Sequence, residues 1–322
     1  MEYDIIGDIH GHSEPLVRLL DDLGYSYSRG AYRHSDPNRM AIFLGDIIDR
    51  GPDQLGSIDI VRRMMDAGTG LCTMGNHEHA AIGWLLPDPD MPDQRMRPHT
   101  QKNYNQHRVF LEQVGDDVAL ASELADWMLS LPLYLSLPGI RCVHACWQPD
   151  VIAKIEAMTR GAGTFTQEML YDSFRKGHDT REAIDITIRG SEVELPDGLS
   201  FIDSDGAPRD KSRVKWWNDK TPLKLRDLIV DPIDTDVDTS KSHFINLGDP
   251  DKRPVFFGHY WMKGEPQLLG RKATCLDFSV AAGGDLCAYS WRGEDVLDPD
   301  NLSWVSNRHE VRHGYKLAIT AG

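Results

Sequence analysis

The first 84 residues repeat one pattern three times: a short apolar run, a turn entered through glycine, and a stretch with helical spacing. The apolar runs are 3–7, 40–44 and 70–74, and the helices are expected over 14–23, about 53–67 and through Trp84. Strands that are joined by helices lie parallel, so their C-terminal ends meet at one edge of a sheet. The pattern therefore predicts an α/β fold in which the three turns converge.

These turns, together with the ends of two later strand-like runs, carry side chains that bind metals. Six of them are oxygen or imidazole donors: Asp8, His10, Asp46, Asn76, His144 and His259. The last two end the runs in CVHAC and FFGHYW. Such donors suit divalent Mn, Fe or Zn rather than a soft thiolate site. The set predicts a centre for two metal ions.

Taken in order, these segments resemble the calcineurin-like metallophosphoesterases, in the branch of the serine/threonine protein phosphatases and the bacterial diadenosine tetraphosphatases. The resemblance covers 3–84, the strands around His144 and about 254–292. It implies a four-layer α/β/β/α sandwich with two divalent metal ions, manganese first and iron or zinc as alternatives. It also implies that Asp46 bridges the two ions. The implied ligands are Asp8, His10 and Asp46 for one ion and Asp46, Asn76, His144 and His259 for the other.

The expected chemistry is hydrolysis of phosphate esters by a metal-activated hydroxide. A pair of ions ~3.5–4 Å apart can clamp a phosphoryl group and lower the pKa of bound water towards ~7. Arg50 presents a planar fork of donors that matches phosphate oxygens, as the arginine of the family's DRG motif does. His77 matches the family's general acid, and Asp49 would orient its imidazole and keep it protonated. No covalent nucleophile is required.

The motifs divide between two substrate classes. GDIIDRG and GNHE resemble the protein phosphatases, whereas FFGHYW and the segments after it resemble the diadenosine tetraphosphatases. Met74 stands where the eukaryotic protein phosphatases have arginine. We therefore expect a protein-phosphatase-like phosphoesterase first, with symmetric hydrolysis of dinucleoside tetraphosphates (Ap4A) as the alternative enzyme. A third hypothesis, an inactive metal or nucleotide sensor, is weakened by Asp49, Arg50 and His77, because a sensor needs no general acid.

Two basic segments are candidates for further substrate contacts. The segment after Trp84 carries Arg95, Arg97, His99, Lys102, His107 and Arg108. It is either a solvated loop and helix or a cap, and in a cap Arg97 and His99 would contact substrate groups beyond the phosphate on the metals. The other segment is a predicted hairpin of LSFID, SDGAP and SRVKWW, in which Arg213 or Lys215 would bind a second phosphate.

Composition restricts the partners. Asp and Glu number 50 against 35 Lys and Arg, and the net charge of −15 argues against long nucleic acids and anionic membranes. A phosphorylated small molecule or a phosphoprotein remains as the expected substrate. The sequence contains no apolar run near the ~20 residues of a membrane span and no basic N-terminal region, so we expect a cytoplasmic protein. The oligomeric state is left open.

The remaining expectations concern organisation. No repeat or linker divides the chain, so one domain over 1–322 is expected, with insertions at about 87–117 and 160–250. The five cysteines lie mostly in apolar runs and are expected as free core thiols. Cys142 and Cys146 flank His144, but we do not expect thiolate ligation. Glu78 and His79 begin a helix and are predicted to be structural.

Overall fold

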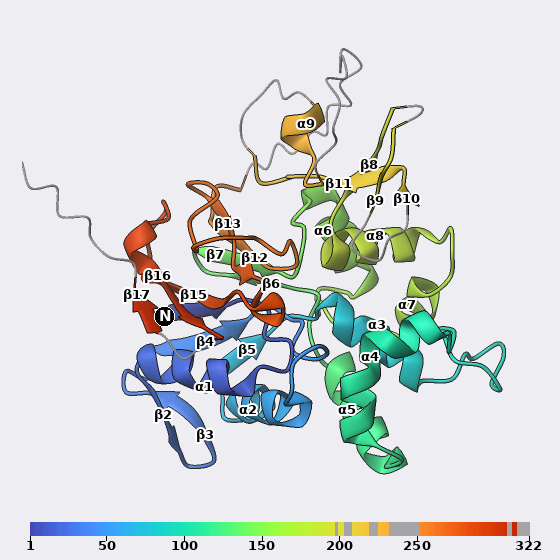
Figure 1. The fold of residues 1–322 in the computed structure, drawn as a ribbon, viewed down its shortest axis with the longest axis horizontal. Helices are drawn as coiled ribbons and strands as arrows, with labels where there is room; N and C mark the ends of the chain where they lie inside the picture. The colour runs from blue at the N-terminus through green and yellow to red at the C-terminus, as the bar shows by residue number, and fades with distance from the viewer. Residues whose placement is uncertain (197–198, 203–207, 219–224, 232–250, 308–310, 314–322) are drawn as a thin grey trace, which may run out of the picture.

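Two β-sheets packed face to face form the centre of the fold (Figure 1). This computed structural model describes residues 1–196, 199–202, 208–218, 225–231, 251–307 and 311–313. The larger, seven-stranded sheet has the order β17-β16-β15-β1-β4-β5, with β14 paired to β15. Its strands are β1 (Glu2–Ile6), β4 (Arg39–Phe43), β5 (Gly70–Cys72), β14 (Asp277–Phe278), β15 (Asp285–Trp291), β16 (Leu302–Ser306) and β17 (Val311–His313).

The three N-terminal strands pair in parallel, as the sequence predicts. Ile6 lies beside Phe43, and Phe43 lies beside Cys72, so β1, β4 and β5 end at the same edge. The predicted strands and helices are confirmed, with ends that differ by one or two residues. On its other side β1 pairs antiparallel with β15, which brings the C-terminal part of the chain into the same sheet.

The smaller sheet has four strands in the order β13-β12-β7-β6. They are β6 (Tyr134–Leu137), β7 (Ile140–Val143), β12 (Val255–Phe257) and β13 (Ala273–Cys275). β12 is parallel to β7 and β13, so the C-terminal end of β7 lies beside the C-terminal end of β12. This sheet therefore presents its own edge of converging strand ends.

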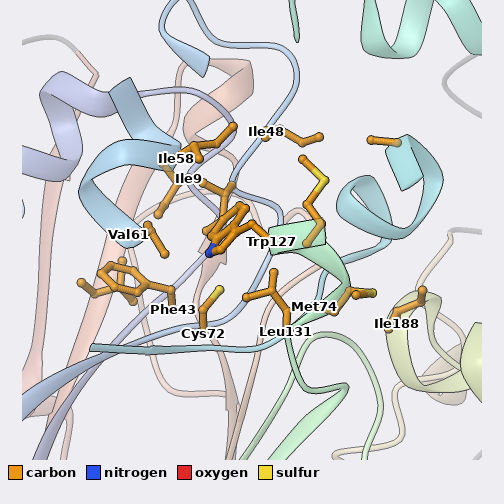
Figure 2. Close-up of a cluster of buried hydrophobic side chains, with 14 of the residues drawn as sticks. Ile9, Phe43, Ile48, Ile58, Val61, Cys72, Met74, Trp127, Leu131 and Ile188 are labelled. Carbon is orange, nitrogen blue, oxygen red and sulfur yellow. The ribbon is translucent and has the colours of Figure 1, made fainter. Parts of the chain in front are cut away.

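Alternation of side chains along β1 and β4 builds the layers. Ile5 and Ile42 face the smaller sheet, where they share a buried cluster with Phe256. Ile6 and Phe43 face the other way, into a cluster with α1 (Ser13–Asp22), α2 (Gln54–Asp66) and α5 (Val118–Leu129). Figure 2 shows part of this second cluster between the sheet and the helices.

The outer face of the smaller sheet is covered as well. Val143 and Phe257 share a cluster with residues of α6 (Pro149–Met158) and α8 (Asp179–Arg189). The order of layers is thus helices, sheet, sheet, helices, which confirms the predicted four-layer α/β/β/α class.

The other described elements are β2 (Tyr25–Ser28), β3 (Ala31–His34), α3 (Asn76–Leu85), α4 (Gln101–Val114), α7 (Gln167–Ser173), β8 (Glu192–Glu194), β9 (Phe201–Ile202), β10 (Pro208–Arg209), β11 (Lys211–Arg213), α9 (Leu225–Leu228), and 3-10 turns at Val280–Ala282 and Pro299–Asn301.

Two predicted segments take more specific forms. The basic segment after α3 returns to the core as α4, which packs against α2. In the predicted hairpin, Phe201 pairs with Arg209 rather than with the SRVKWW run, and Arg213 pairs with Glu192 of β8. The predicted pairing of that hairpin was therefore wrong, because SRVKWW finds its partner in the strand that follows α8. All but the last residue of its predicted turn SDGAP, 204–208, and most of the acidic run at 230–240 lie outside the described residues.

All five cysteines are buried and free, as expected. In the described part of the chain no helix has the length and apolar character that crossing a membrane requires.

Candidate metal centre and active site

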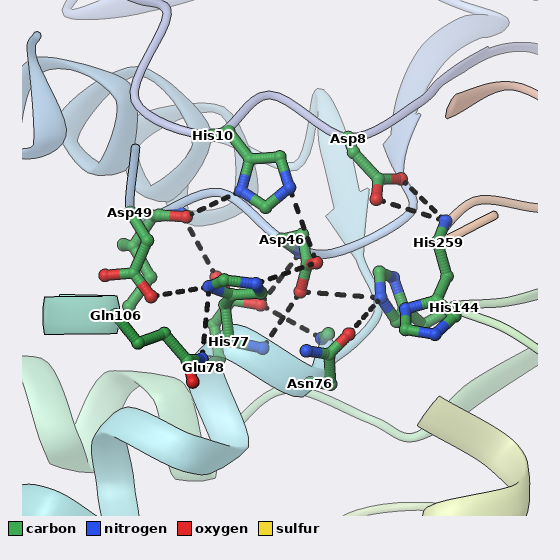
Figure 3. A network of polar contacts seen from close by, with 12 residues as sticks. Asp8, His10, Asp46, Asp49, Asn76, His77, Glu78, Gln106, His144 and His259 are labelled. Atoms are coloured by element: carbon green, nitrogen blue, oxygen red, sulfur yellow. Dashed lines mark hydrogen bonds and ion pairs between the residues drawn. The ribbon is translucent and has the colours of Figure 1, made fainter. Parts of the chain in front are cut away.

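The ends of the parallel strands of both sheets bring the predicted ligands together, as Figure 3 shows. The loops after β1 and β4, the start of α3, and the residues just after β7 and β12 carry Asp8, His10, Asp46, Asn76, His144 and His259. The two sheets are joined at this edge, since the His259 N–H, just after β12 of the smaller sheet, donates a 3.1 Å hydrogen bond to the Asp8 carboxylate, just after β1 of the larger sheet. The layered fold therefore positions the centre.

Asp46 lies between two groups of potential ligands. One group contains Asp46, His10 and His77, and the other contains Asp46, His144 and His259, with the ligand atoms of each group within 4.8 Å of one another. The Asp46 Oδ2 atom lies 3.6 Å from His10 Nε2, and its Oδ1 atom lies 3.4 Å from His144 Nε2. A single carboxylate thus faces both groups, which is the position that a bridging ligand requires.

Asp8 and Asn76 adjoin these groups. The Asp8 carboxylate accepts the backbone N–H of His259 at 3.1 and 3.3 Å. The Asn76 Oδ1 atom lies 3.1 Å from His144 Nε2. Both side chains are therefore within reach of the site, although Asp8 belongs to neither of the two compact groups among the described residues.

Backbone carbonyls orient two of the imidazoles. His10 Nδ1 donates to the Ile48 carbonyl at 2.9 Å, and His144 Nδ1 donates to the Leu44 carbonyl at 2.7 Å. These bonds leave Nε2 of each ring directed at Asp46, and outer hydrogen bonds of this kind are typical of metal-binding histidines.

The donors fit a pair of divalent cations. The His10 Nε2 and His259 Nδ1 atoms are buried and have no hydrogen-bond partner among the described residues. Burial, together with the nearby Asp277 carboxylate, raises the pKa of Asp8 well above its usual range. Burial disfavours the charged form of His144, but the Asp46 carboxylate outweighs burial and raises the pKa of His144 to about 10. Buried carboxylates and open imidazole nitrogens of this kind are what a bound cation would satisfy.

The turns that hold the ligands are strained. His10, Asp46, Asp49, Arg50 and His259 all have φ between +49° and +74°, in the left-handed region. For residues other than glycine each such conformation costs about 1–3 kcal/mol and persists only where the surroundings enforce it. The cluster of strained residues coincides with the ligand cluster, as expected for a functional site.

The Glu78 carboxylate enforces part of this conformation. It is fully buried at the start of α3 and accepts backbone N–H groups from Asp46 at 2.8 Å, Ile47 at 2.8 Å, Ile48 at 3.2 Å and Gly75 at 3.0 Å. Glu78 therefore ties the second turn to the third, which agrees with its predicted structural role. His79 is also buried, stacks on Phe174 and bonds Ser173.

A buried pair of polar side chains lies beside the ligands. His77 Nδ1 is 2.5 Å from Asp49 Oδ2, and His77 Nε2 is 3.8 Å from Asp46 Oδ2. Burial raises the pKa of Asp49, but the hydrogen bonds of His107 and His77 outweigh burial and lower it to about 2. Burial likewise opposes the charged His77, yet Asp46 and Asp49 raise its pKa. The resemblance predicted the His77–Asp49 contact, but the sequence, which placed His107 only in the basic segment after Trp84, did not predict that His107 also contacts Asp49.

Arg50 is exposed at the mouth of the site. The Arg50 Cζ atom lies 4.0 Å from the centroid of the Trp261 ring. This cation–π contact restricts the orientation of the guanidinium. Both residues line the same cavity as His77 and His259.

This cavity has a volume of about 1380 Å³. Nine of its lining residues are basic: Arg50, Arg97, Lys102, Arg108, Arg181, Arg189, Arg209, Lys211 and Arg213. Among the residues of this lining that the structure describes, only four are acidic: Asp46, Asp185, Glu192 and Asp231. The cavity is therefore rich in cations although the whole chain has a net charge of −15.

Not all predicted substrate contacts reach this cavity. Arg97 and Arg213 line it, whereas His99 and Lys215 are absent from its described lining. His99 stacks on Trp84 at 3.7 Å and bonds the Trp84 carbonyl. Neither Cys142 nor Cys146 belongs to a potential metal group among the described residues.

The chain matches one known family. The model of the family described as calcineurin-like phosphoesterase covers residues 1–259. Among curated proteins, the bis(5'-nucleosyl)-tetraphosphatase PrpE (asymmetrical) of Oceanobacillus iheyensis is 46% identical over 162 residues, which are 50% of this chain and 62% of that protein. The protein of the same name from Halalkalibacterium halodurans is 47% identical over 86 residues, 27% of this chain and 35% of that one. The chain thus spans less than two thirds of the length of either relative.

Solved structures show a looser similarity. A protein serine/threonine phosphatase from Saccharomyces cerevisiae overlaps 95% of this chain and 79% of its own, at 14% identity and a TM-score of 0.49.

Proposed function

The chain belongs to the calcineurin-like phosphoesterase family, and from this premise we propose that it is a two-metal hydrolase of dinucleoside polyphosphates. The observation that carries the proposal is the excess of basic residues along the cavity. A phosphate monoester needs the metal ions and Arg50, because it presents one phosphoryl group. A polyphosphate bridge carries a negative charge on each phosphate and can use the cations further along the cavity.

The ligand residues define where the ions would bind. Asp8, His10 and Asp46 would hold one divalent ion, and Asp46, Asn76, His144 and His259 would hold the other. When bound, such a pair supplies Lewis-acid polarisation of the phosphoryl group and acidifies water. We expect manganese first, with iron or zinc as alternatives.

The residues around the ligands supply the remaining chemistry. Arg50, stacked on Trp261, presents two parallel N–H donors to the phosphate oxygens. His77 keeps Nε2 towards the site because Nδ1 is bonded to Asp49, so Nε2 can donate a proton to the leaving oxygen. Arg213, on β11, is the candidate for a second phosphate.

Two expectations from the sequence change in rank. A protein-phosphatase-like activity was expected first, and the basic cavity now favours the dinucleoside polyphosphate alternative. That alternative was expected as symmetric cleavage, whereas the names of both relatives specify asymmetrical cleavage. We therefore propose asymmetrical cleavage, which for diadenosine tetraphosphate yields ATP and AMP. The third hypothesis, a sensor, is disfavoured by the buried His77–Asp49 pair, which ligand binding alone does not require.

A substrate panel tests this proposal. With added Mn²⁺, kcat/KM is measured for diadenosine tetraphosphate, p-nitrophenyl phosphate and a phosphoserine peptide, and the nucleotide products are separated by anion exchange. We expect the tetraphosphate to be preferred by at least about tenfold, as one extra charge-assisted contact allows. Preference for the phosphopeptide would favour a protein-phosphatase-like activity instead. Formation of ADP as the sole product of the tetraphosphate would support symmetric cleavage. No turnover of any substrate would support the sensor hypothesis.

A cavity variant with a matched control completes the test. Arg213→Gln should raise KM for the tetraphosphate about tenfold and change KM for p-nitrophenyl phosphate much less, because the small ester does not extend to β11. Lys154→Gln, an exposed cation of α6 that is not among the lining residues, should change neither. Equal effects of Arg213→Gln on both substrates would remove Arg213 from the polyphosphate site.

A further inference from the structure

A second buried histidine contacts the carboxylate that holds His77. His107, from α4, places Nδ1 2.8 Å from Asp49 Oδ2, the same oxygen that lies 2.5 Å from His77 Nδ1. The side chains of His107 and Asp49 are both fully buried. One carboxylate oxygen is thus shared by two imidazoles from different helices.

Arg97 fixes the protonation of this second histidine. Its Nη1 atom donates to His107 Nε2 at 2.5 Å, and its Nη2 atom donates to Gln106 Oε1 at 2.8 Å. Arg97 remains cationic at neutral pH, although burial and the neighbouring Arg189 lower its pKa to about 10. A nitrogen that accepts from arginine carries no proton, so the proton of neutral His107 is on Nδ1, directed at Asp49. Burial lowers the pKa of His107, which agrees with the neutral form.

The Asp49 side chain has few other restraints. Its backbone N–H bonds Gln54 Oε1 at 2.5 Å, but its Oδ1 atom has no hydrogen-bond partner among the described residues. The direction of the carboxylate therefore depends on the two imidazoles. If His107 were absent, the carboxylate could rotate and His77 would follow it.

We propose that His107 and Arg97 are positioning residues that hold the Asp49 carboxylate in the orientation that keeps His77 directed at the leaving group. This inference rests on the phosphoesterase function proposed above and on the acid role of His77. It gives the basic segment after α3 a different use from the one that the sequence suggested. Arg97 lines the cavity, but both of its terminal nitrogens bond protein groups of α4, so we assign it to α4 rather than to the substrate.

The test uses two aryl phosphates, so it does not depend on the identity of the natural substrate. Phenyl phosphate has a poor leaving group that needs an acid, and p-nitrophenyl phosphate has a good one that needs it less. The variants are His107→Phe, which keeps the ring but removes both nitrogens, and His107→Asn, which can still donate one N–H towards Asp49. Each is made in the native chain and in His77→Asn. His34→Phe, on β3 away from the cavity, is the matched histidine control.

We expect His107→Phe to lower kcat for phenyl phosphate about 10- to 100-fold, with a smaller loss for p-nitrophenyl phosphate and unchanged KM and metal content. His107→Asn should recover much of the loss, and Arg97→Met should show the same selectivity with a loss of about fivefold. In the His77→Asn background, His107→Phe and Arg97→Met should cause no further loss of kcat, because a positioning residue acts only through the group it positions. His34→Phe should match the native enzyme.

Three results would overturn the inference: equal losses for both substrates, losses that multiply with that of His77→Asn, or no loss at all. If His77→Asn itself shows no leaving-group selectivity, the acid role fails and this inference fails with it. If His107→Phe does not fold, as thermal unfolding would reveal, Arg97→Met in the same two backgrounds decides. Failure of the polyphosphate proposal alone would leave all these aryl phosphate results unchanged.

Discussion

Replacing Glu78 by glutamine tests whether one buried carboxylate holds the strained turn between the two metal groups. In the native protein each Glu78 oxygen accepts two backbone N–H groups: Oε1 those of Ile47 and Ile48, and Oε2 those of Asp46 and Gly75. In Glu78→Gln one oxygen becomes an NH₂ group, which cannot accept. Two of the four bonds are then lost, and a donor faces two buried donors.

The size of the effect follows from those bonds. A hydrogen bond to a charged group contributes about 1.5–3 kcal/mol, so two lost bonds should lower the free energy of unfolding by about 3–6 kcal/mol. This is a large part of the 5–15 kcal/mol that is typical of whole domains. We also expect weaker metal binding, because the backbone of Asp46 loses one of its restraints.

The loss in the free energy of unfolding is measured by urea unfolding of the metal-free protein, followed by tryptophan fluorescence. With a slope near 3 kcal/mol/M the midpoint should fall by about 1–2 M. Glu123→Gln is the control, since Glu123 pairs with Arg62 at 2.6 Å on the surface and such exposed pairs contribute about 0–1 kcal/mol. If both variants shift the midpoint by the same small amount, the four backbone bonds do not stabilise the turn, and the reasoning is refuted.

Three further predictions concern the metal centre. Asp46→Asn should abolish phosphoesterase activity and lower metal content measured by plasma emission, because an amide cannot bridge two dications; two retained metals with full activity would contradict the bridging role. Gly258→Ala should lower metal affinity at least tenfold in titrations, since the new Cβ would lie 1.9 Å from Asp8 Oδ1, whereas in the control Gly270→Ala the nearest atom is 3.4 Å away. A chelator should lower the melting temperature by about 10 °C in the native protein, because each ion at 100-fold its Kd stabilises by about 2.7 kcal/mol and two ions by about 5 kcal/mol; an unchanged melting temperature would mean that no metal was bound.

The sequence alone determined the local parts of the site. In each N-terminal unit a strand, a glycine turn and a helix are contiguous, so their order indicates both a parallel sheet and the edge at which Asp8, Asp46 and Asn76 gather. The contact of His77 with Asp49 was also expected, because His77 matches the general acid of the family that the motifs resemble and a carboxylate commonly orients such an imidazole. The second sheet was expected only from the family resemblance, which implies the four-layer sandwich that the two buried faces of β1 then show.

Only the tertiary structure decided the contacts that depend on how distant elements pack. His107 is 58 residues from Asp49 in sequence. The residue pattern of α4 does not indicate which face of the helix packs towards α2 and the His77–Asp49 pair. The same holds for His99, whose ring stacks on Trp84 instead of lining the cavity. It holds too for Arg213, whose strand pairs with β8 and not with the neighbouring run. Local spacing specifies which elements form, whereas the orientation of an inserted element depends on the sum of its long-range contacts, and a single sequence does not display that sum.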